Sequence, residues 1–394
     1  MRKITSNYLF SVTQGNLKNG IIILNDDGTI ADVIDNRGLL YEISNLEYYN
    51  GILVPGFINT HCHLELSYLK GKIDNPEGLT GFIAQMLEKR LIGEENAYQA
   101  AVEADNKMYL NGITGVGDIS NTDVTFRLKS SSLLDYYTFI EVFDLPSRNA
   151  ELIFSKGKEL LCYAHQTGLK ASLVPHAPYS VSTKLLEQIA ENFNNSESIY
   201  SIHNQESQTE NELFISGKGK LSEFLIHSGI EMSRFNPTGF SSLKSIISKI
   251  PMVGNILLVH NTFTSLDDID VSISELKKLF WVICPNSNLI IEGRLPDLKE
   301  MCSKELNIAV GTDSYASNTD LSILSELKTI SKYFPEISLD ILIRWATLNG
   351  AKALNMDKKK GSFEKGKKPG VNLITGIDFD LMRLTEESKV KVLM

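Results

Sequence analysis

Short apolar runs alternate with amphipathic stretches along most of this 394-residue chain, from Ile52 to Gly311. Stretches such as Gly81–Leu91 repeat apolar residues at helical spacing, as helices packed on a sheet do. The apolar runs have the length and β-branched composition of buried strands, and there are eight of them: Ile52–Thr60, Ile113–Ile119, Leu134–Val142, Lys170–Val174, Ile199–His203, Asn255–His260, Leu279–Cys284 and Asn307–Gly311. Eight strand-helix units over about 300 residues predict a closed (β/α)8 barrel rather than an open parallel sheet.

The two ends of the chain lack this alternation and instead read as short strands separated by turns. Asp27-Gly28, between two apolar runs, is a strong hairpin signal. The strand-like segments are Tyr8–Val12, Gly20–Leu24 and Ile30–Ile34 at the start, and Val371–Thr375 and Lys389–Leu393 at the end. We therefore expect a small β-sandwich domain built from both termini, residues 1–54 and 361–394, beside a catalytic barrel of residues 55–360.

The composition limits the class of partner. Acidic residues outnumber basic ones by 48 to 39, a formal net charge of −9, which argues against nucleic acid or an anionic membrane surface as a partner. The four cysteines are scattered without a framework spacing, and neither a signal sequence nor a membrane-length apolar run is recognisable. We expect a cytoplasmic protein that acts on a small molecule.

Five of the seven histidines stand where a predicted strand ends: His61, His63, His176, His203 and His260. An acid, Asp313, follows the eighth strand. In a (β/α)8 barrel the carboxyl ends of all strands meet at one mouth, so these side chains would share one pocket. Since residues i and i+2 of a strand face the same side, a His-x-His pair can offer two ligands to one ion. Three imidazoles and a carboxylate, from His61, His63, His203 and Asp313, suit a divalent metal ion such as zinc.

Each of these signals has an ordinary structural explanation when it is taken alone. A single histidine is more often structural than functional, and His165 and His227, which lie in helical stretches, receive no role. Taken alone, Glu206 would be interpreted as a solvated loop residue, but it follows His203 by three positions. Beside four metal ligands it is placed to carry protons.

Six motifs, in the same order along the chain, resemble the amidohydrolase superfamily. They are Pro55-Gly-Phe-Ile-Asn-Thr-His61-Cys-His63, Val174-Pro-His176-Ala-Pro-Tyr179-Ser, His203-Asn-Gln-Glu206-Ser, Leu258-Val-His260-Asn, Cys284-Pro-Asn-Ser-Asn288 and Gly311-Thr-Asp313-Ser. Within the superfamily the chain is most similar to the chlorohydrolase-type aminohydrolases, which include S-adenosylhomocysteine, guanine, cytosine and aminofutalosine deaminases. The short stretch Leu64-Glu65-Leu-Ser67 is most similar to aminofutalosine deaminases.

The resemblance implies a role for each matching residue. It makes His61, His63, His203 and Asp313 the ligands of one divalent ion, usually Zn²⁺ and sometimes Fe²⁺. Glu206 matches the proton shuttle, His260 the histidine beside the reacting water, and His176 the substrate-facing residue after the fourth strand. With Asp313 also accepting a proton, the implied reaction is hydrolytic deamination of a nucleobase, nucleoside or related heterocycle. The resemblance also implies a homodimer.

Two alternatives remain at this point. The chain could be a two-metal hydrolase of amides or cyclic amides, although such relatives generally place a bridging lysine or glutamate where this chain has His176. It could also be a ligand-binding barrel without catalysis, although none of the expected ligands is missing. The substrate stays open, and from their loop positions we expect Glu65 and Tyr179 to line its pocket beside His176.

Overall fold

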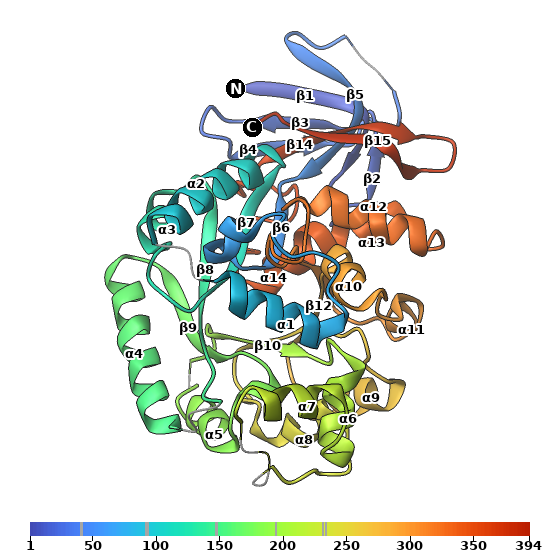
Figure 1. Ribbon diagram of the computed structural model, residues 1–394. Helices are drawn as coiled ribbons and strands as arrows, with labels where there is room; N and C mark the ends of the chain where they lie inside the picture. Colours follow the sequence, from blue (N-terminus) through green and yellow to red (C-terminus); the bar gives the residue numbers. More distant parts are fainter. Residues whose placement is uncertain (40–41, 91–93, 146–148, 194, 231, 233–234) are drawn as a thin grey trace.

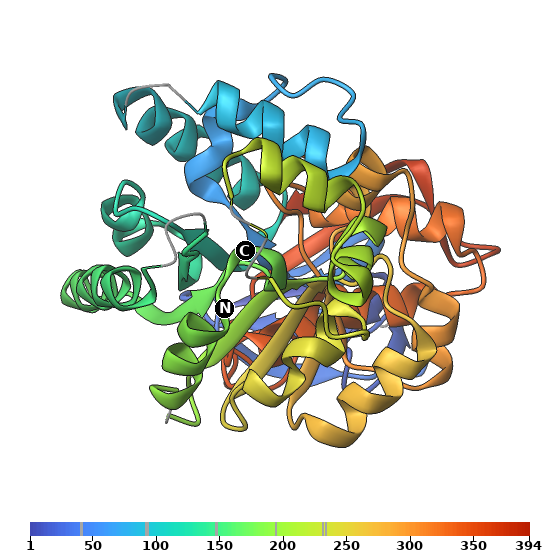
Figure 2. The same cartoon turned by 60° about the horizontal axis from the view of Figure 1, so that its bottom comes forward.

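The computed structural model describes residues 1–394 except 40–41, 91–93, 146–148, 194, 231 and 233–234. A sheet built from both termini lies at one end of the molecule, and a larger body of parallel strands and helices lies beneath it (Figure 1). Figure 2 shows the helices of this body arranged around its strands.

Eight parallel strands form the centre of the larger body and follow one another in chain order within two four-stranded sheets. One sheet contains β6 (Phe57–Cys62), β7 (Ile113–Ser120), β8 (Asp135–Val142) and β9 (Lys170–Pro175). The other contains β10 (Ile199–Asn204), β11 (Asn255–His260), β12 (Leu279–Ile283) and β13 (Ile308–Val310). A parallel bridge between Cys62 and Asp313 joins one pair of sheet edges. A backbone hydrogen bond of 2.9 Å from His203 to His176 joins the other pair.

Side chains from all eight strands meet in one apolar cluster, as expected for strands that surround a common interior. The strand residues of this cluster are Ile58, Ile119, Tyr137, Phe139, Val174, Ile199, Leu257, Val259, Phe280, Val282 and Ala309. A second, larger cluster lies between the strands and the helices outside them. The β-branched and aromatic runs of the sequence therefore fill both faces of the strands, which explains their continuous apolar character.

Helices follow most of the strands, and several begin with a serine that caps the first turn, such as Ser182, Ser207 and Ser265. The longer helices are α1 (Gly78–Lys89), α2 (Glu94–Leu110), α4 (Ala150–Gln166), α5 (Thr183–Glu191), α6 (Gln208–Ser216), α7 (Lys220–His227), α9 (Leu266–Glu275), α10 (Pro285–Glu292) and α12 (Ile323–Tyr333). The shorter ones are α3 (Phe126–Ser131), α8 (Ser242–Ile246), α11 (Leu298–Ser303), α13 (Leu339–Arg344) and α14 (Gly350–Ala353). Short 3₁₀ segments are η1 (Leu64–Leu69), η2 (Pro178–Ser180) and η4 (Ile247–Lys249), and η5 (Trp345–Asn349) is a π-helical segment.

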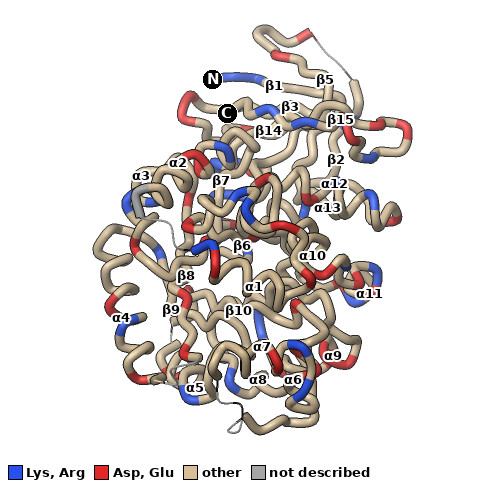
Figure 3. Tube along the Cα trace, viewed as in Figure 1, with Lys and Arg blue, Asp and Glu red and all other residues tan. Residues whose placement is uncertain are grey.

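The predicted helix Gly81–Leu91 corresponds to α1, and its last residue, Leu91, lies outside the described residues. Acidic and basic residues are interspersed along the outer helices (Figure 3), so the negative net charge is not concentrated in one segment. Among the helices in the described part of the chain, none has both the length and the apolar character needed to cross a bilayer.

The two termini combine in one seven-stranded sheet with the order β15-β14-β5-β1-β3-β4, and β2 pairs with β1. Its strands are β1 (Arg2–Phe10), β2 (Asn16–Lys18), β3 (Ile21–Leu24), β4 (Ile30–Ile34), β5 (Leu46–Pro55), β14 (Val371–Asp378) and β15 (Arg383–Val392). β14 pairs antiparallel with β5, and this pairing joins the C-terminal segment to the N-terminal one.

The predicted strand Ile52–Thr60 was wrong as a single element. The chain breaks at Gly56, so that β5 belongs to the terminal sheet and β6 to the parallel strands. A Cβ atom at position 56 would lie 2.3 Å from Thr114 Cγ2 and 2.5 Å from the carbonyl oxygen of Pro369. Only glycine fits where the two parts of the molecule approach so closely, and apolar periodicity cannot reveal that approach.

We expect Gly56→Ala to lower the free energy of unfolding by about 1–3 kcal/mol, the usual cost of forcing a methyl group into a packed contact. Chemical denaturation would measure the change. Gly81→Ala is the matched control, because its Cβ would meet its nearest neighbour at an ordinary 3.6 Å. Equal stability of the two variants would contradict the steric explanation for the break.

Candidate metal centre and active site

Four side chains converge at the carboxyl ends of the parallel strands. His61 and His63 come from the end of β6, His203 from β10, and Asp313 from the loop after β13. His63 Nε2 lies 3.1 Å from His61 Nε2 and 3.3 Å from His203 Nε2. Asp313 Oδ1 lies 3.7 Å from His61 Nε2 and 3.4 Å from His63 Nε2. The strands thus bring together residues that are separated by up to 252 positions in the sequence (313 − 61).

The chemistry of this donor set fits a divalent metal ion. His203 Nδ1 donates to the carbonyl oxygen of His176 at 2.8 Å, which leaves its Nε2 lone pair facing the other two imidazoles. Burial, reinforced by the neighbouring imidazoles, holds the pKa of His63 well below its ordinary value, against the opposing effect of Asp313. Neutral imidazoles with lone pairs directed at a common point, beside a carboxylate, are what zinc-type ions bind.

The protein holds Asp313 from several sides. Asp313 has a left-handed backbone (φ 57°). The backbone amides of Thr312 and Asp313 both donate to the carbonyl oxygen of His61 at 3.0 Å. Its Oδ2 atom accepts hydrogen bonds from Ser287 at 2.7 Å and Ser317 at 2.5 Å, so Oδ1 is the oxygen that faces the histidines. Burial alone would raise its pKa, but His61, His63 and His260 outweigh burial and keep the pKa of Asp313 well below its ordinary value.

Glu206 lies on the turn that follows β10, where Gln205 has a left-handed backbone (φ 46°). Glu210 fixes this turn, because its carboxylate accepts from Gln205 N at 3.2 Å and from Glu206 N at 3.3 Å. Burial raises the pKa of Glu206 to about 7, with Asp313 and Glu292 adding to the effect and His260 opposing it. A carboxyl group with a pKa near neutrality is suited to both giving and taking a proton.

His260 ends β11 and is almost fully buried. Its Nδ1 atom hydrogen-bonds Asn288 Oδ1 at 2.9 Å, and its Nε2 atom lies 3.6 Å from Glu206 Oε1. The Asn288 side chain also donates to the carbonyl oxygen of His260 at 3.4 Å. Asn288 therefore fixes the orientation of the imidazole that faces Glu206.

Of the residues expected to line the substrate pocket, His176 lies nearest the converging side chains, with its ring centroid 4.7 Å from that of His203. His176 Nδ1 hydrogen-bonds Ser180 Oγ at 2.7 Å, and burial lowers the pKa of His176 to about 4, so this imidazole is neutral. The ring of Tyr179 lies edge-on to that of His176, with 5.9 Å between the centroids. Glu65, on η1, directs its carboxylate at the loop after β7, where it accepts from the backbone amides of Asn121 and Thr122. Contact of these three residues with substrate stays a prediction.

Several buried polar residues at the same mouth were missed by the sequence analysis. Glu141 lies next to the end of β8 with its Oε1 atom 3.5 Å from His203 Nδ1, and Asp118 lies near the end of β7. The rule that strand ends carry function would have found both, had it been applied to carboxylates as well as to histidines. Ser287 and Ser317 gave no comparable signal, because their role depends on loop geometry.

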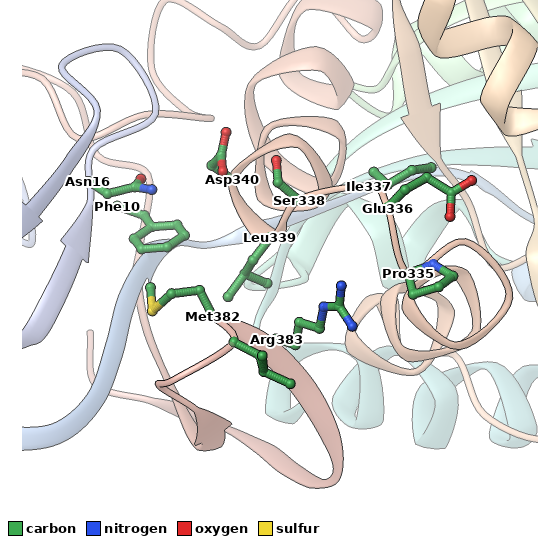
Figure 4. A pocket seen from close by; sticks show the side chains of 11 residues that line it. Phe10, Asn16, Pro335, Glu336, Ile337, Ser338, Leu339, Asp340, Met382 and Arg383 are labelled. Carbon is green, nitrogen blue, oxygen red and sulfur yellow. The ribbon is translucent and has the colours of Figure 1, made fainter.

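A separate cavity of ≈ 300 Å³ lies between the terminal sheet and the segment that joins α12 to α13 (Figure 4). Phe10 and Asn16 line it from the N-terminal strands, Met382 and Arg383 from the C-terminal hairpin, and Ser338 and Asp340 from the start of α13. No predicted site residue is among its lining residues.

Comparison with known proteins agrees with this geometry. A model of the amidohydrolase family matches residues 52–394. An adenosine deaminase of Helicobacter pylori is 30% identical over 360 residues, which cover 88% of this chain and 85% of the relative. A 5'-deoxyadenosine deaminase of Methanococcus vannielii is 27% identical over 340 residues, 81% of this chain and 73% of the relative. The crystal structure of Helicobacter pylori aminofutalosine deaminase in complex with methylthio-coformycin superposes with a TM-score of 0.80 at 26% identity, covering 95% of this chain and 92% of that one.

Proposed function

The chain belongs to the amidohydrolase family, and we propose that it is a metal-dependent hydrolase that releases ammonia from an amino-substituted heterocycle. The observation that carries this proposal is the convergence of three imidazoles and a carboxylate next to Glu206, a buried acid whose pKa is near neutrality. Deaminases are also the relatives that it resembles along most of its length. The family's fold, a (β/α)8 barrel with an additional domain, agrees with the eight strands in chain order.

We assign the metal site to His61, His63, His203 and Asp313, with one ion of the zinc or iron(II) type. When bound, such an ion supplies Lewis-acid activation of a water molecule, whose pKa it lowers towards neutrality. The short distances between the imidazole Nε2 atoms, and the approach of Asp313 Oδ1 to His63 Nε2 at 3.4 Å, support this ligand set. Three imidazole nitrogens and one carboxylate oxygen favour zinc or iron over magnesium or calcium.

Glu206 performs the proton transfers of the proposed reaction. Attack by water at the amine-bearing ring carbon breaks aromaticity, so the adjacent ring nitrogen must gain a proton as the new C–O bond forms. The protonated Glu206 donates that proton, and Asp313 and His260 accept and orient the proton that the water loses. The ionised Glu206 then takes the remaining hydroxyl proton of the adduct and passes it to the exocyclic amine, the C–N bond breaks, and ammonia leaves. The proton held at Asp313 returns to Glu206 and restores the starting state.

Adenine nucleosides are our first candidates for the substrate. Two of the relatives described above are named as deaminases of adenosine and of 5'-deoxyadenosine. We propose that His176, Tyr179 and Glu65 belong to the wall of the pocket. The ring of His176 lies 4.7 Å from that of His203, Tyr179 packs edge-on against His176, and Glu65 follows His63 by two positions. We also propose that residues 1–54 and 361–394 form a composite β-sandwich domain beside a catalytic domain of residues 55–360, and that the protein acts as a homodimer.

Ammonia release by the purified, zinc-loaded protein tests this function. The panel contains adenosine, 5'-deoxyadenosine, adenine, guanine and cytosine, with dihydrouracil as a cyclic-amide substrate for the alternative reaction. We expect ammonia from at least one amino-substituted ring, with the adenine nucleosides ahead of the free bases, and no opening of the cyclic amide. Turnover of dihydrouracil without any deamination would overturn the proposed reaction.

A further inference from the structure

A buried ion pair lies beside the metal site and has no part in the reaction described above. Asp118, in β7, and Lys129, in α3, form a salt bridge, and both side chains are 0% exposed. Lys129 Nζ also donates to Ser120 Oγ at 2.7 Å and lies above the rings of Phe126 and Tyr136. Taking two charges out of water is expensive, so a buried pair of this kind is weak evidence for stability alone.

Asp118 also holds the segment that carries two metal ligands. Its Oδ1 atom accepts a hydrogen bond of 2.7 Å from Leu64 N, the amide that directly follows His63. The pairing between β6 and β7 becomes irregular between Asn59 and Cys62, where Cys62 pairs with Asp118. Beyond that point the Asp118 carboxylate supplies the acceptor that a strand carbonyl would otherwise provide.

The opposite side of the same segment is held by the loop of Asp313. The carbonyl oxygen of His61 accepts from Thr312 N and Asp313 N. Asn59 Nδ2 donates a hydrogen bond of 2.7 Å to Thr312 Oγ1. The His61-Cys62-His63 segment therefore lies between a fixed backbone on one side and a single carboxylate on the other. Lys129 is the counter-charge of that carboxylate, so loss of Lys129 would leave Asp118 buried without a cation.

We propose that Asp118, held in place by Lys129, is a positioning residue that fixes His61 and His63 in the geometry that binds the metal ion. The proposal rests on the metal site proposed above, and it does not depend on which heterocycle is the substrate. Its consequence is that the pair controls how tightly the ion is held, and not only whether the chain folds. Outer residues that orient metal ligands typically contribute 10–100-fold to metal affinity.

The test compares Asp118→Ala, Asp118→Asn and Lys129→Met with the wild type as zinc-loaded protein. The readouts are the rate of zinc loss to an excess of chelator and the visible spectrum of the cobalt(II)-substituted protein, neither of which needs a substrate. We expect zinc loss to be faster by about 10–100-fold in Asp118→Ala, with changed cobalt bands. Asp118→Asn keeps an acceptor for Leu64 N, and we expect it to lie between Asp118→Ala and the wild type. Lys129→Met should resemble the Asp118 variants, because both members act as one unit.

Lys360→Met is the matched control. Lys360 pairs with Asp135 at 3.0 Å, at the opposite end of β8 from the metal ligands, so its loss should leave zinc loss and the cobalt spectrum unchanged. If Asp118→Ala does not fold, Asp118→Asn and Lys129→Met carry the test. Wild-type rates and spectra in the folded Asp118 and Lys129 variants, with only thermal stability lowered, would overturn the positioning role. A wild-type protein that holds zinc but deaminates nothing would instead contradict the proposed function and leave this inference intact.

Discussion

Glu206→Gln is expected to lower turnover by about 10²–10⁴-fold while the bound metal content stays unchanged. Glutamine has the same shape as glutamate but cannot carry a proton between the ring nitrogen and the departing amine. Metal content should be preserved, because Glu206 lies outside the groups of converging ligand atoms among the described residues. Steady-state kinetics with the best substrate of the panel, together with metal analysis, would measure both quantities.

Glu223→Gln provides the matched control, because Glu223 is an exposed glutamate on α7. It should show wild-type turnover. If Glu206→Gln retained near-normal turnover with metal bound, Glu206 would have no place in the mechanism, whatever the control showed.

The protonation of Glu206 should also make kcat/KM depend on pH. Only the protonated carboxyl group can donate to the ring nitrogen, and burial raises the pKa of Glu206 to about 7. The competent fraction of the enzyme therefore falls as the pH rises through 7, and kcat/KM should decrease about tenfold for each pH unit above it. Glu206→Gln should lack this limb. A rate that instead rises through pH 7 would show that Glu206 begins the reaction ionised.

Asp313→Ala is expected to remove both the metal and the activity. Asp313 is the one carboxylate among the four proposed ligands, and it is also a proton acceptor in the proposed reaction. Loss of a metal's contribution to the transition state, several kcal/mol, corresponds to a rate at least about 10³-fold lower. Metal analysis after gel filtration and an ammonia assay with and without added zinc would measure the two effects.

His227→Ala is the control for this variant, because His227 is exposed on α7 and its imidazole bonds only the Glu223 carbonyl oxygen among the described residues. It should retain full metal content. Full zinc occupancy in Asp313→Ala would remove Asp313 from the ligand set and leave the site to the histidines.

Much of this site could be predicted from the sequence. The parallel strands follow one another in chain order, and functional side chains of such folds lie at the carboxyl ends of the strands. That principle, the His-x-His spacing and the family motifs together predicted His61, His63, His203 and Asp313 as ligands, and the structure brings the four together. Apart from the first run, Ile52–Thr60, the pattern of apolar runs located the parallel strands to within a few residues, since buried strands are continuous apolar segments bounded by polar turns.

The parts that escaped prediction depend on contacts between distant segments. Apolar content is continuous across Gly56, so the division between β5 and β6 is visible only once Thr114 and Pro369 are in place. The pairing of Asn288 with His260 and of Lys129 with Asp118 joins residues on different elements, for which one sequence offers no spacing rule. Positions along the chain could indicate which residues converge at the proposed metal site, but not which residues hold them in place.

The central claim is that one divalent ion binds at His61, His63, His203 and Asp313. Diffraction from crystals of the zinc-loaded protein at the zinc absorption edge would test it most directly. We predict one anomalous peak per chain, within about 2.0–2.2 Å of the three Nε2 atoms and of an Asp313 carboxylate oxygen. Two peaks of equal height, or a peak that His203 or Asp313 does not reach, would contradict the claim.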